Sequence, residues 1–148
     1  MPIYLQGKQV PWGWTKEVEA LIAKQVRGYC VHLCSGDSEI GDIRVDLYAR
    51  SHSNWFEDVR DLSLPSEFAD TVVCDPPYNY GRAGVEAACV FHSIRILKPG
   101  GRLLWYHFNV PYEQALELEQ LWVYPNKTQP FYRFLSQHKK IQRSLSSA

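Results

Sequence analysis

The residue types best suited to chemistry stand together at Asp75, Pro76, Pro77 and Tyr78, directly after the apolar run 71–74. Such a run is typical of a buried strand in a parallel sheet, and ligands of these sheets bind at the carboxyl ends of the strands. Because the prolines fix the backbone, the segment predicts a rigid shelf that carries a carboxylate, carbonyl groups and an aromatic face. This shelf suits a planar base with an exocyclic NH2 group.

The chemistry of that amine assigns a role to each part of the shelf. An exocyclic amine on adenine or cytosine is a poor nucleophile because its lone pair is delocalised into the ring. If Asp75 and the Pro76 carbonyl accept its two N–H bonds, the nitrogen is drawn toward tetrahedral geometry and its lone pair can attack. Tyr78 would stack on the base. The predicted catalytic set is therefore Asp75, Pro76, Pro77 and Tyr78.

The elements that must position this shelf alternate between helix and strand patterns. Helices are expected from the Thr15 cap to about Arg27, over 85–97 and over 111–119. Strands are expected over 29–33, 43–48, within 56–62, and over 71–74, 102–108, 121–124 and 131–136. This order predicts an α/β fold with a mostly parallel seven-stranded sheet and an antiparallel C-terminal hairpin.

The first two connections between strands are unusually short. Residues 34–42 and 49–55 leave no room for the helix that normally crosses over a parallel sheet. One face of the sheet is therefore expected to have little cover beyond the N-terminal helix. An uncovered apolar face is a liability, and a homodimer through this face is one solution.

Composition limits the class of protein. The 148 residues, 45% of them hydrophobic, predict a single domain over 1–148, with an N-terminal segment and helix (1–28), a catalytic core (29–137) and a basic tail (138–148). No apolar run approaches the roughly 20 residues of a membrane span, and no signal peptide is recognised, so a cytoplasmic protein without a membrane partner is expected. The four cysteines lack zinc spacing, so buried thiols and no metal are expected.

Charge is unevenly spread although the formal net charge is zero. No acid follows Glu119, whereas five basic residues do: Lys127, Arg133, Lys139, Lys140 and Arg143. Such a stretch can contact phosphates, and it can equally be a solvated terminus. Both interpretations stay open at this point.

The chain resembles the class I S-adenosylmethionine-dependent methyltransferases of the DPPY type, which modify exocyclic amines of bases in DNA, in a minimal form without a target-recognition domain. The resemblance covers about 29–137 and rests on the Asp75 motif, on the segment 31–36 with Gly36, and on the segments 43–47 and 56–62. It implies a Rossmann-like fold and S-adenosylmethionine as cofactor. Of the glycine-rich first loop of the family, only Gly36 matches.

The resemblance also assigns residues to the cofactor and the substrate. Asp46 would accept hydrogen bonds from the ribose hydroxyls, and Asp58 and Val59 would contact the adenine. The full cofactor set that it implies is Leu33, Cys34, Ser35, Gly36, Asp46, Leu47, Asp58, Val59 and Asp75. Candidate substrate contacts, from the loop after the shelf, the fifth strand and the tail, are Tyr80, Arg82, His107, Asn109, Lys139 and Lys140.

These observations favour methyl transfer to an exocyclic base amine, with N6 of adenine in DNA ahead of N4 of cytosine. An RNA base methyltransferase is the alternative, because motif analogy does not decide the polymer. A non-catalytic subunit that binds nucleic acid or a partner is a second alternative. Nucleic acid is the expected partner, DNA before RNA, and a homodimer or another subunit could supply target recognition.

Overall fold

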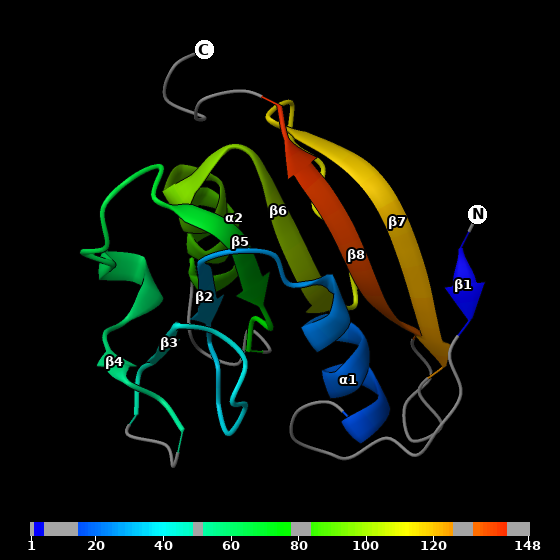
Figure 1. Cartoon of the computed structure of the whole chain (residues 1–148), viewed down its shortest axis with the longest axis horizontal. Helices are drawn as coiled ribbons and strands as arrows, with labels where there is room; N and C mark the ends of the chain where they lie inside the picture. Colours follow the sequence, from blue (N-terminus) through cyan, green and yellow to red (C-terminus); the bar gives the residue numbers. More distant parts are fainter. Residues whose placement is uncertain (1, 5–14, 49–51, 78–83, 126–131, 142–148) are drawn as a thin grey trace.

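The computed structural model describes residues 2–4, 15–48, 52–77, 84–125 and 132–141 (Figure 1). These residues form one sheet and two α-helices. The helices are α1 (Lys16–Gln25) and α2 (Val85–Ile96), with a 3-10 helix η1 (Val59–Asp61). The strands are β1 (Ile3–Tyr4), β2 (Cys30–Leu33), β3 (Ile43–Asp46), β4 (Trp55–Phe56), β5 (Ala69–Cys74), β6 (Leu97–His107), β7 (Leu116–Pro125) and β8 (Tyr132–Lys140).

The sheet has the order β1-β7-β8-β6-β5-β2-β3-β4. Strand β8 runs antiparallel to both of its neighbours, β6 and β7, and the other described pairs are parallel. This arrangement confirms the predicted α/β fold with a mostly parallel sheet and a C-terminal hairpin. The two-residue strand β1 was not predicted and adds an eighth strand beside β7.

The helix expected over 111–119 is wrong. Residues from Leu116 onward form strand β7, which pairs with β8 along its length. The physical reason is visible in the residues Leu116, Glu117, Leu118 and Glu119, because apolar and acidic side chains alternate there with the period of a strand. The alternation at 116–119 therefore indicates a strand and not a helix.

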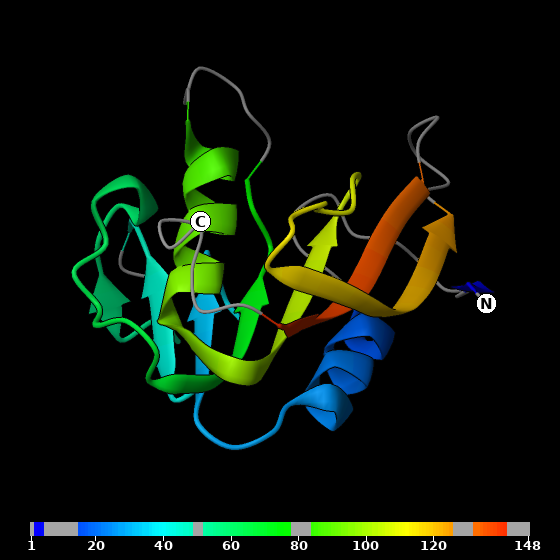
Figure 2. The ribbon, with the colours of Figure 1, turned by 90° about the horizontal axis from the view of Figure 1, so that it is seen from above.

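Two hydrophobic cores lie on opposite faces of the sheet, each under one helix (Figure 2). Helix α1 begins at its predicted cap, where the Thr15 side chain accepts a hydrogen bond from the Val18 N–H at 3.3 Å. It packs Val18 and Ile22 against strands β2, β5, β6 and β8. Helix α2 packs on the other face, over the buried residues Val31, Leu33, Val72, Cys74, Leu103 and Trp105.

A loop takes the place of the first crossover helix, between β2 and β3, as the short connection predicted. Between β2 and β3 the chain makes no helix, and side chains hold the loops to the strands. The Asp42 carboxylate accepts from the Cys30 N–H at 2.8 Å, and the Arg44 guanidinium donates to the Gly41 carbonyl at 2.7 Å. Asn54 accepts from the Arg44 N–H at 2.7 Å. These polar contacts fix thin loops where a helix would otherwise pack.

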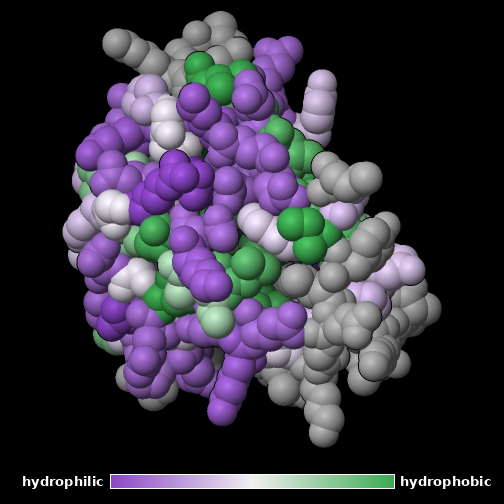
Figure 3. Space-filling view, turned by 45° about the vertical axis from the view of Figure 1, so that its right-hand side comes forward, coloured by the Kyte–Doolittle hydropathy of each residue, from purple (hydrophilic) through white to green (hydrophobic). Residues whose placement is uncertain are grey.

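The homodimer through the thinly covered face stays a prediction. The face seen in Figure 3 is largely polar, with hydrophobic residues in separate patches.

The predicted basic tail needs a correction, because its first three residues, 138–140, belong to strand β8 and not to a terminal segment. Within the described parts of the chain, neither helix has the length and apolar character that a membrane crossing requires.

Candidate functional site

The predicted shelf lies at one edge of the sheet, where four parallel strands end together. Leu33 pairs with Cys74, and Cys74 pairs with Trp105, so β2, β5 and β6 reach this edge in register. Strand β3 pairs with β2 and ends at Asp46. The carboxyl edge, as we call it, therefore carries the loop after β2, the end of β3, the Asp75 shelf and the end of β6.

Asp75 is half-buried and follows the last residue of β5. Burial raises the pKa of its carboxyl to about 7; the Cys34 sulfur acts in the same direction and the Arg133 guanidinium opposes both. Pro76 is buried and Pro77 is half-buried, so the backbone after Asp75 is held by packing as well as by its rings. Tyr78 lies outside the described residues.

Two residues that the sequence analysis did not assign, Arg133 and Tyr106, interact electrostatically with Asp75. Arg133, at the start of β8, is 6% exposed and places its guanidinium carbon 5.8 Å from the ring centre of Tyr106 and 5.7 Å from that of Phe108. Burial raises the pKa of Tyr106 well above its usual value, and the Asp75 charge acts in the same direction, so the phenol stays protonated. An arginine held between two rings beside a carboxylate forms a fixed positive counterpart to Asp75.

The loop after β2 turns through two left-handed residues. Cys34 has φ of 57° and Gly36 has φ of 55°, and a Cβ placed on Gly36 would meet no atom within 4 Å. The Asp46 carboxylate accepts from the Gly36 N–H at 2.8 Å and from the Tyr48 N–H at 3.2 Å. The structure thus brings Gly36 and Asp46 together, with open space at the glycine.

The residues implied for adenine contact are engaged within the protein. The Asp58 carboxylate accepts from the Arg60 N–H at 2.9 Å and pairs with the Arg60 guanidinium at 2.6 Å. Val59 is 6% exposed and packs in the core under α2. Leu47, in contrast, is 39% exposed at the end of β3. A ligand at this point would have to compete with Arg60 for Asp58.

His107 and Asn109 lie on the α2 side, bound to a residue that the sequence analysis missed. Glu86, in the first turn of α2, pairs with the His107 ring at 3.4 Å and accepts a hydrogen bond from the Asn109 side chain. Asn109 also accepts from the Trp105 indole at 3.3 Å. Burial lowers the pKa of His107, and Glu86 opposes that shift. These contacts join the end of β6 to the first turn of α2; His107 is buried and Asn109 is exposed, and their contact with a substrate stays a prediction.

The two lysines predicted to contact substrate lie at a distance from the Asp75 shelf. Lys139 pairs with Arg102 near the start of β6, at the opposite edge of the sheet. Lys140 is 1% exposed, and its ammonium donates to the Leu97 carbonyl at 2.6 Å. The antiparallel direction of β8 carries its last residues away from Asp75. The candidates Tyr80 and Arg82 fall outside the described residues.

Three thiols gather beneath the shelf. The Cys34 and Cys89 sulfurs are 3.8 Å apart, and burial raises the pKa of the Cys74 thiol. Cys30 is buried on the other face, where burial raises its pKa to about 12. Among the described residues, no group of three or more histidines, cysteines or acids has an arrangement that could hold a metal ion.

Comparisons with known proteins find similarity in structure alone. No family model matches the chain, and no curated protein matches it in sequence. A Burkholderia thailandensis 1,6-didemethyltoxoflavin-N1-methyltransferase, crystallised with S-adenosylhomocysteine, has a TM-score of 0.61 at 9% identity over 86% of this chain and 78% of its own. A Listeria monocytogenes protein assigned to the class I S-adenosylmethionine-dependent methyltransferases has a TM-score of 0.61 at 13% identity, over 86% of this chain and 60% of its own.

A third solved structure is an rRNA methylase from Streptococcus thermophilus, with a TM-score of 0.52 at 11% identity over 85% of this chain and 95% of its own. The chain therefore has the Rossmann-like fold of class I methyltransferases. These neighbours act on different kinds of molecule by their names, so the fold alone leaves the substrate to be argued from the site.

Proposed function

We propose that this chain transfers a methyl group from S-adenosylmethionine to an exocyclic amine of a nucleic-acid base, with N6 of adenine in DNA as the first substrate and N4 of cytosine as the second. The observation that carries the proposal is the Asp75-Pro76-Pro77 segment at the carboxyl end of β5, in a fold that class I methyltransferases share. The acid stands where the fold places ligands.

The residues around Gly36 fit the cofactor. Open space at the left-handed Gly36 allows a ligand to approach the backbone closely, and the loop from Leu33 to Gly36 would hold the methionine part. Asp46 already accepts two N–H groups, yet a carboxylate has about four lone-pair sites and can accept ribose hydroxyls as well. When bound, the cofactor supplies an electrophilic methyl group on a sulfonium.

The chain itself contributes orientation and charge. The Asp75 carboxylate and the Pro76 carbonyl would accept the two N–H bonds of the amine and hold its lone pair along one direction. As positive charge develops on the nitrogen, the Asp75 anion stabilises it. Because burial raises the pKa of Asp75 to about 7, the carboxyl must lose its proton before it can act, and Arg133 favours that loss.

The test is methyl transfer from labelled S-adenosylmethionine to single-stranded DNA, duplex DNA and RNA in parallel. We expect label on DNA and, after digestion, N6-methyladenine among the nucleosides. Single strands avoid the cost of about a few kcal/mol for flipping a base out of a duplex, so they should react faster.

Calorimetry with the cofactor separates the alternatives. Label on RNA alone would show that the substrate is an RNA base and not a DNA base. Absence of label on every polymer, together with absence of cofactor binding, would overturn the proposed reaction and favour a non-catalytic binding subunit. Absence of label despite cofactor binding would contradict a nucleic-acid substrate for the chain acting by itself.

A further inference from the structure

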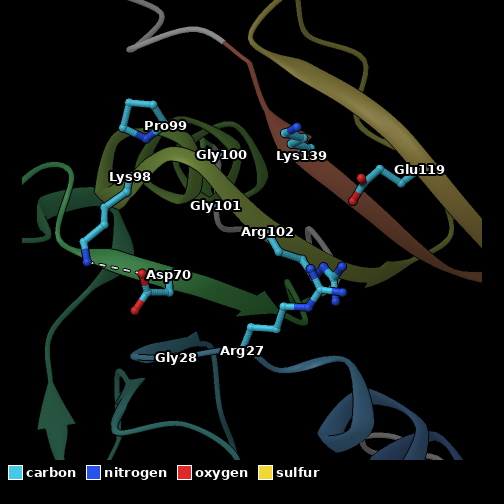
Figure 4. A pocket seen from close by; sticks show the side chains of 10 residues that line it. All are labelled: Arg27, Gly28, Asp70, Lys98, Pro99, Gly100, Gly101, Arg102, Glu119 and Lys139. Carbon is cyan, nitrogen blue, oxygen red and sulfur yellow. Dashed lines mark hydrogen bonds and ion pairs between the residues drawn. The ribbon is translucent and has the colours of Figure 1, made fainter.

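The amino edge of the sheet, opposite the candidate site, has a cavity of about 560 Å³. It lies among the segment between α1 and β2, the start of β5, the start of β6 and the end of β8 (Figure 4). Cavities of this size hold small organic ligands. The cavity therefore has room for a phosphate group together with part of the molecule that carries it.

Glycines shape the walls of this amino-edge pocket. A Cβ on Gly28, which has φ of 60°, would lie 2.4 Å from the Asp70 carboxylate. A Cβ on Gly101 would lie 2.8 Å from the Lys98 carbonyl and 3.1 Å from that of Asp70. Only glycine lets these two backbone segments approach Asp70 so closely. The pocket is thus a built feature of the fold.

Positive charge dominates the lining. Arg27, Lys98, Arg102 and Lys139 face two carboxylates, Asp70 and Glu119, which leaves a surplus of two positive charges. The guanidinium groups of Arg27 and Arg102 lie beside one another in Figure 4, and the Arg27 charge helps to lower the pKa of Arg102, after burial.

Strand pairing adds to this repulsion. Lys139 on β8 stands directly opposite Arg102 on β6, and like charges in such a pair are unfavourable. Glu117 on β7 is the cross-strand partner of Lys139 on its other side. Arg102 therefore has a like charge on two sides, Arg27 and Lys139, an arrangement that a bound anion would stabilise.

The two acids in the pocket are already engaged. Asp70 accepts from the Tyr29 N–H at 2.8 Å and pairs with the Lys98 ammonium at 3.2 Å. Glu119 accepts from the Gln137 side chain at 3.4 Å. The Arg102 guanidinium donates one N–H to the Gln25 carbonyl at 2.9 Å. The remaining guanidinium donors are suited to a phosphate, whose oxygens match their planar geometry.

The distance to the candidate site is compatible with one nucleic-acid segment. Asp70 is the second residue of β5 and Asp75 follows its end, five residues away, which corresponds to about 17 Å of strand at about 3.3 Å per residue. Along a nucleic-acid strand this equals about five steps of about 3.4 Å. The basic edge and the catalytic edge are therefore within reach of one short segment.

We infer that the amino-edge pocket binds a backbone phosphate of the nucleic-acid substrate, several nucleotides from the base that enters the Asp75 site. This inference rests on the proposed function. Arg27 and Lys139 are two exposed cations of the pocket. The hydrogen bonds between Arg27 and Thr71 are made by the Arg27 backbone, so a change of the Arg27 side chain keeps them. The pocket supplies affinity and no part of the methyl transfer.

The test compares Arg27→Gln/Lys139→Gln with the matched control Lys16→Gln/Lys24→Gln, which removes two exposed cations of α1 that do not line the pocket. Fluorescence anisotropy measures binding of labelled oligonucleotides of about three and about twelve nucleotides. The pocket variant should bind the longer one about tenfold more weakly, with a salt slope smaller by about 1.4. The short one should bind both variants equally, and kcat at saturating DNA should not change.

Equal losses in the two double variants would overturn the inference, because they would indicate general charge attraction. Unchanged affinity for the longer oligonucleotide in the pocket variant would overturn it too, and methyl transfer by the same samples would leave the proposed function standing. If inorganic phosphate binds the wild type by calorimetry, and this binding alone is lost in the pocket variant, the site holds a free anion and the inference is wrong. Wild-type protein that binds neither oligonucleotide would contradict both proposals.

Discussion

The two edges of the sheet differ in the sign of their charge and in how they hold it. At the carboxyl edge the titratable groups are each held in place: Asp75 is half-buried near Arg133, and Asp46 accepts two backbone N–H groups. At the amino edge Arg27 and Lys139 are exposed. The two candidate sites thus differ, with two held carboxylates at one edge and two exposed cations at the other.

This difference has a chemical meaning under the proposed function. A carboxylate edge suits a sulfonium cofactor and an amine that becomes positive during the reaction, whereas a cationic edge suits phosphates. Held groups act on the rate of a reaction because they are preorganised, and exposed cations act on affinity and its salt dependence. Substitutions at the two edges should therefore change different kinetic constants.

The largest effect is expected for Asp75→Asn. The variant keeps the size of the side chain but removes its negative charge and replaces one acceptor oxygen by an NH2 group. We expect kcat to fall by at least about 100-fold, with binding of oligonucleotides changed by less than about threefold, in steady-state methyl-transfer and anisotropy measurements. Asp61→Asn, at an exposed acid at the end of η1, is the matched control. An Asp75→Asn variant with weaker oligonucleotide binding and an unchanged kcat would contradict the proposed difference between the two edges.

A smaller effect is expected from pH. The pKa of Asp75 is about 7 in the folded protein, so the active carboxylate fraction should rise about tenfold per pH unit below that value and level off near pH 8. Between about pH 4 and 7 the folded protein binds more protons at Asp75 than the unfolded chain does, so this residue should lower stability as the pH rises through that window. Initial rates and urea midpoints at pH 5.5 and pH 8 measure both.

The same pH series on Asp75→Asn provides the control. Both dependences should flatten in the variant. A wild-type rate profile that is level from pH 5.5 to pH 8 would show that the carboxyl edge does not hold Asp75 in the way that its burial indicates.

The smallest effect is expected for Glu86→Gln. The substitution removes the charge beside His107 and keeps an acceptor for Asn109. Because Glu86 acts through these neighbours as a positioning residue, kcat should fall by about three- to tenfold, corresponding to about 1 kcal/mol. The pKa of His107, followed by NMR, should fall further, since Glu86 opposes the effect of burial. An unchanged pKa of His107 would rule out the pairing.

The sequence was sufficient for the shelf and the strands that lead to it, because an apolar run followed by Asp75 and two prolines is a local signal. It was not sufficient for Arg133 and Glu86. Their contacts with Asp75 and His107 depend on strand and helix packing between residues far apart in the chain. The edge at which Lys139 lies was equally out of reach, since the direction of β8 decides where its last residues lie.

The alternation of Leu and Glu after residue 115 is a local pattern that indicates strand β7, although a helix over 111–119 was expected there. The roles implied for Asp58 and Val59 show the limit of a motif, because a side chain can match in type and still be engaged by a neighbour such as Arg60. The Asp46 carboxylate, by contrast, accepts from the Gly36 N–H at 2.8 Å, so these two residues lie together at the carboxyl edge, and their cofactor roles stay a prediction.

The position of β8 in the sheet has a consequence for the order of folding. Strand β8 comes last among the described strands, yet it lies inside the sheet, and β7 and β1 join the other strands only through it. While the ribosome has released the chain only as far as Pro125, β8 is missing, so β6 has one unpaired edge and the β1–β7 pair is not connected to it. An unpaired edge can capture a strand from another molecule. The edge of β6 is therefore exposed to aggregation in the interval before β8 inserts.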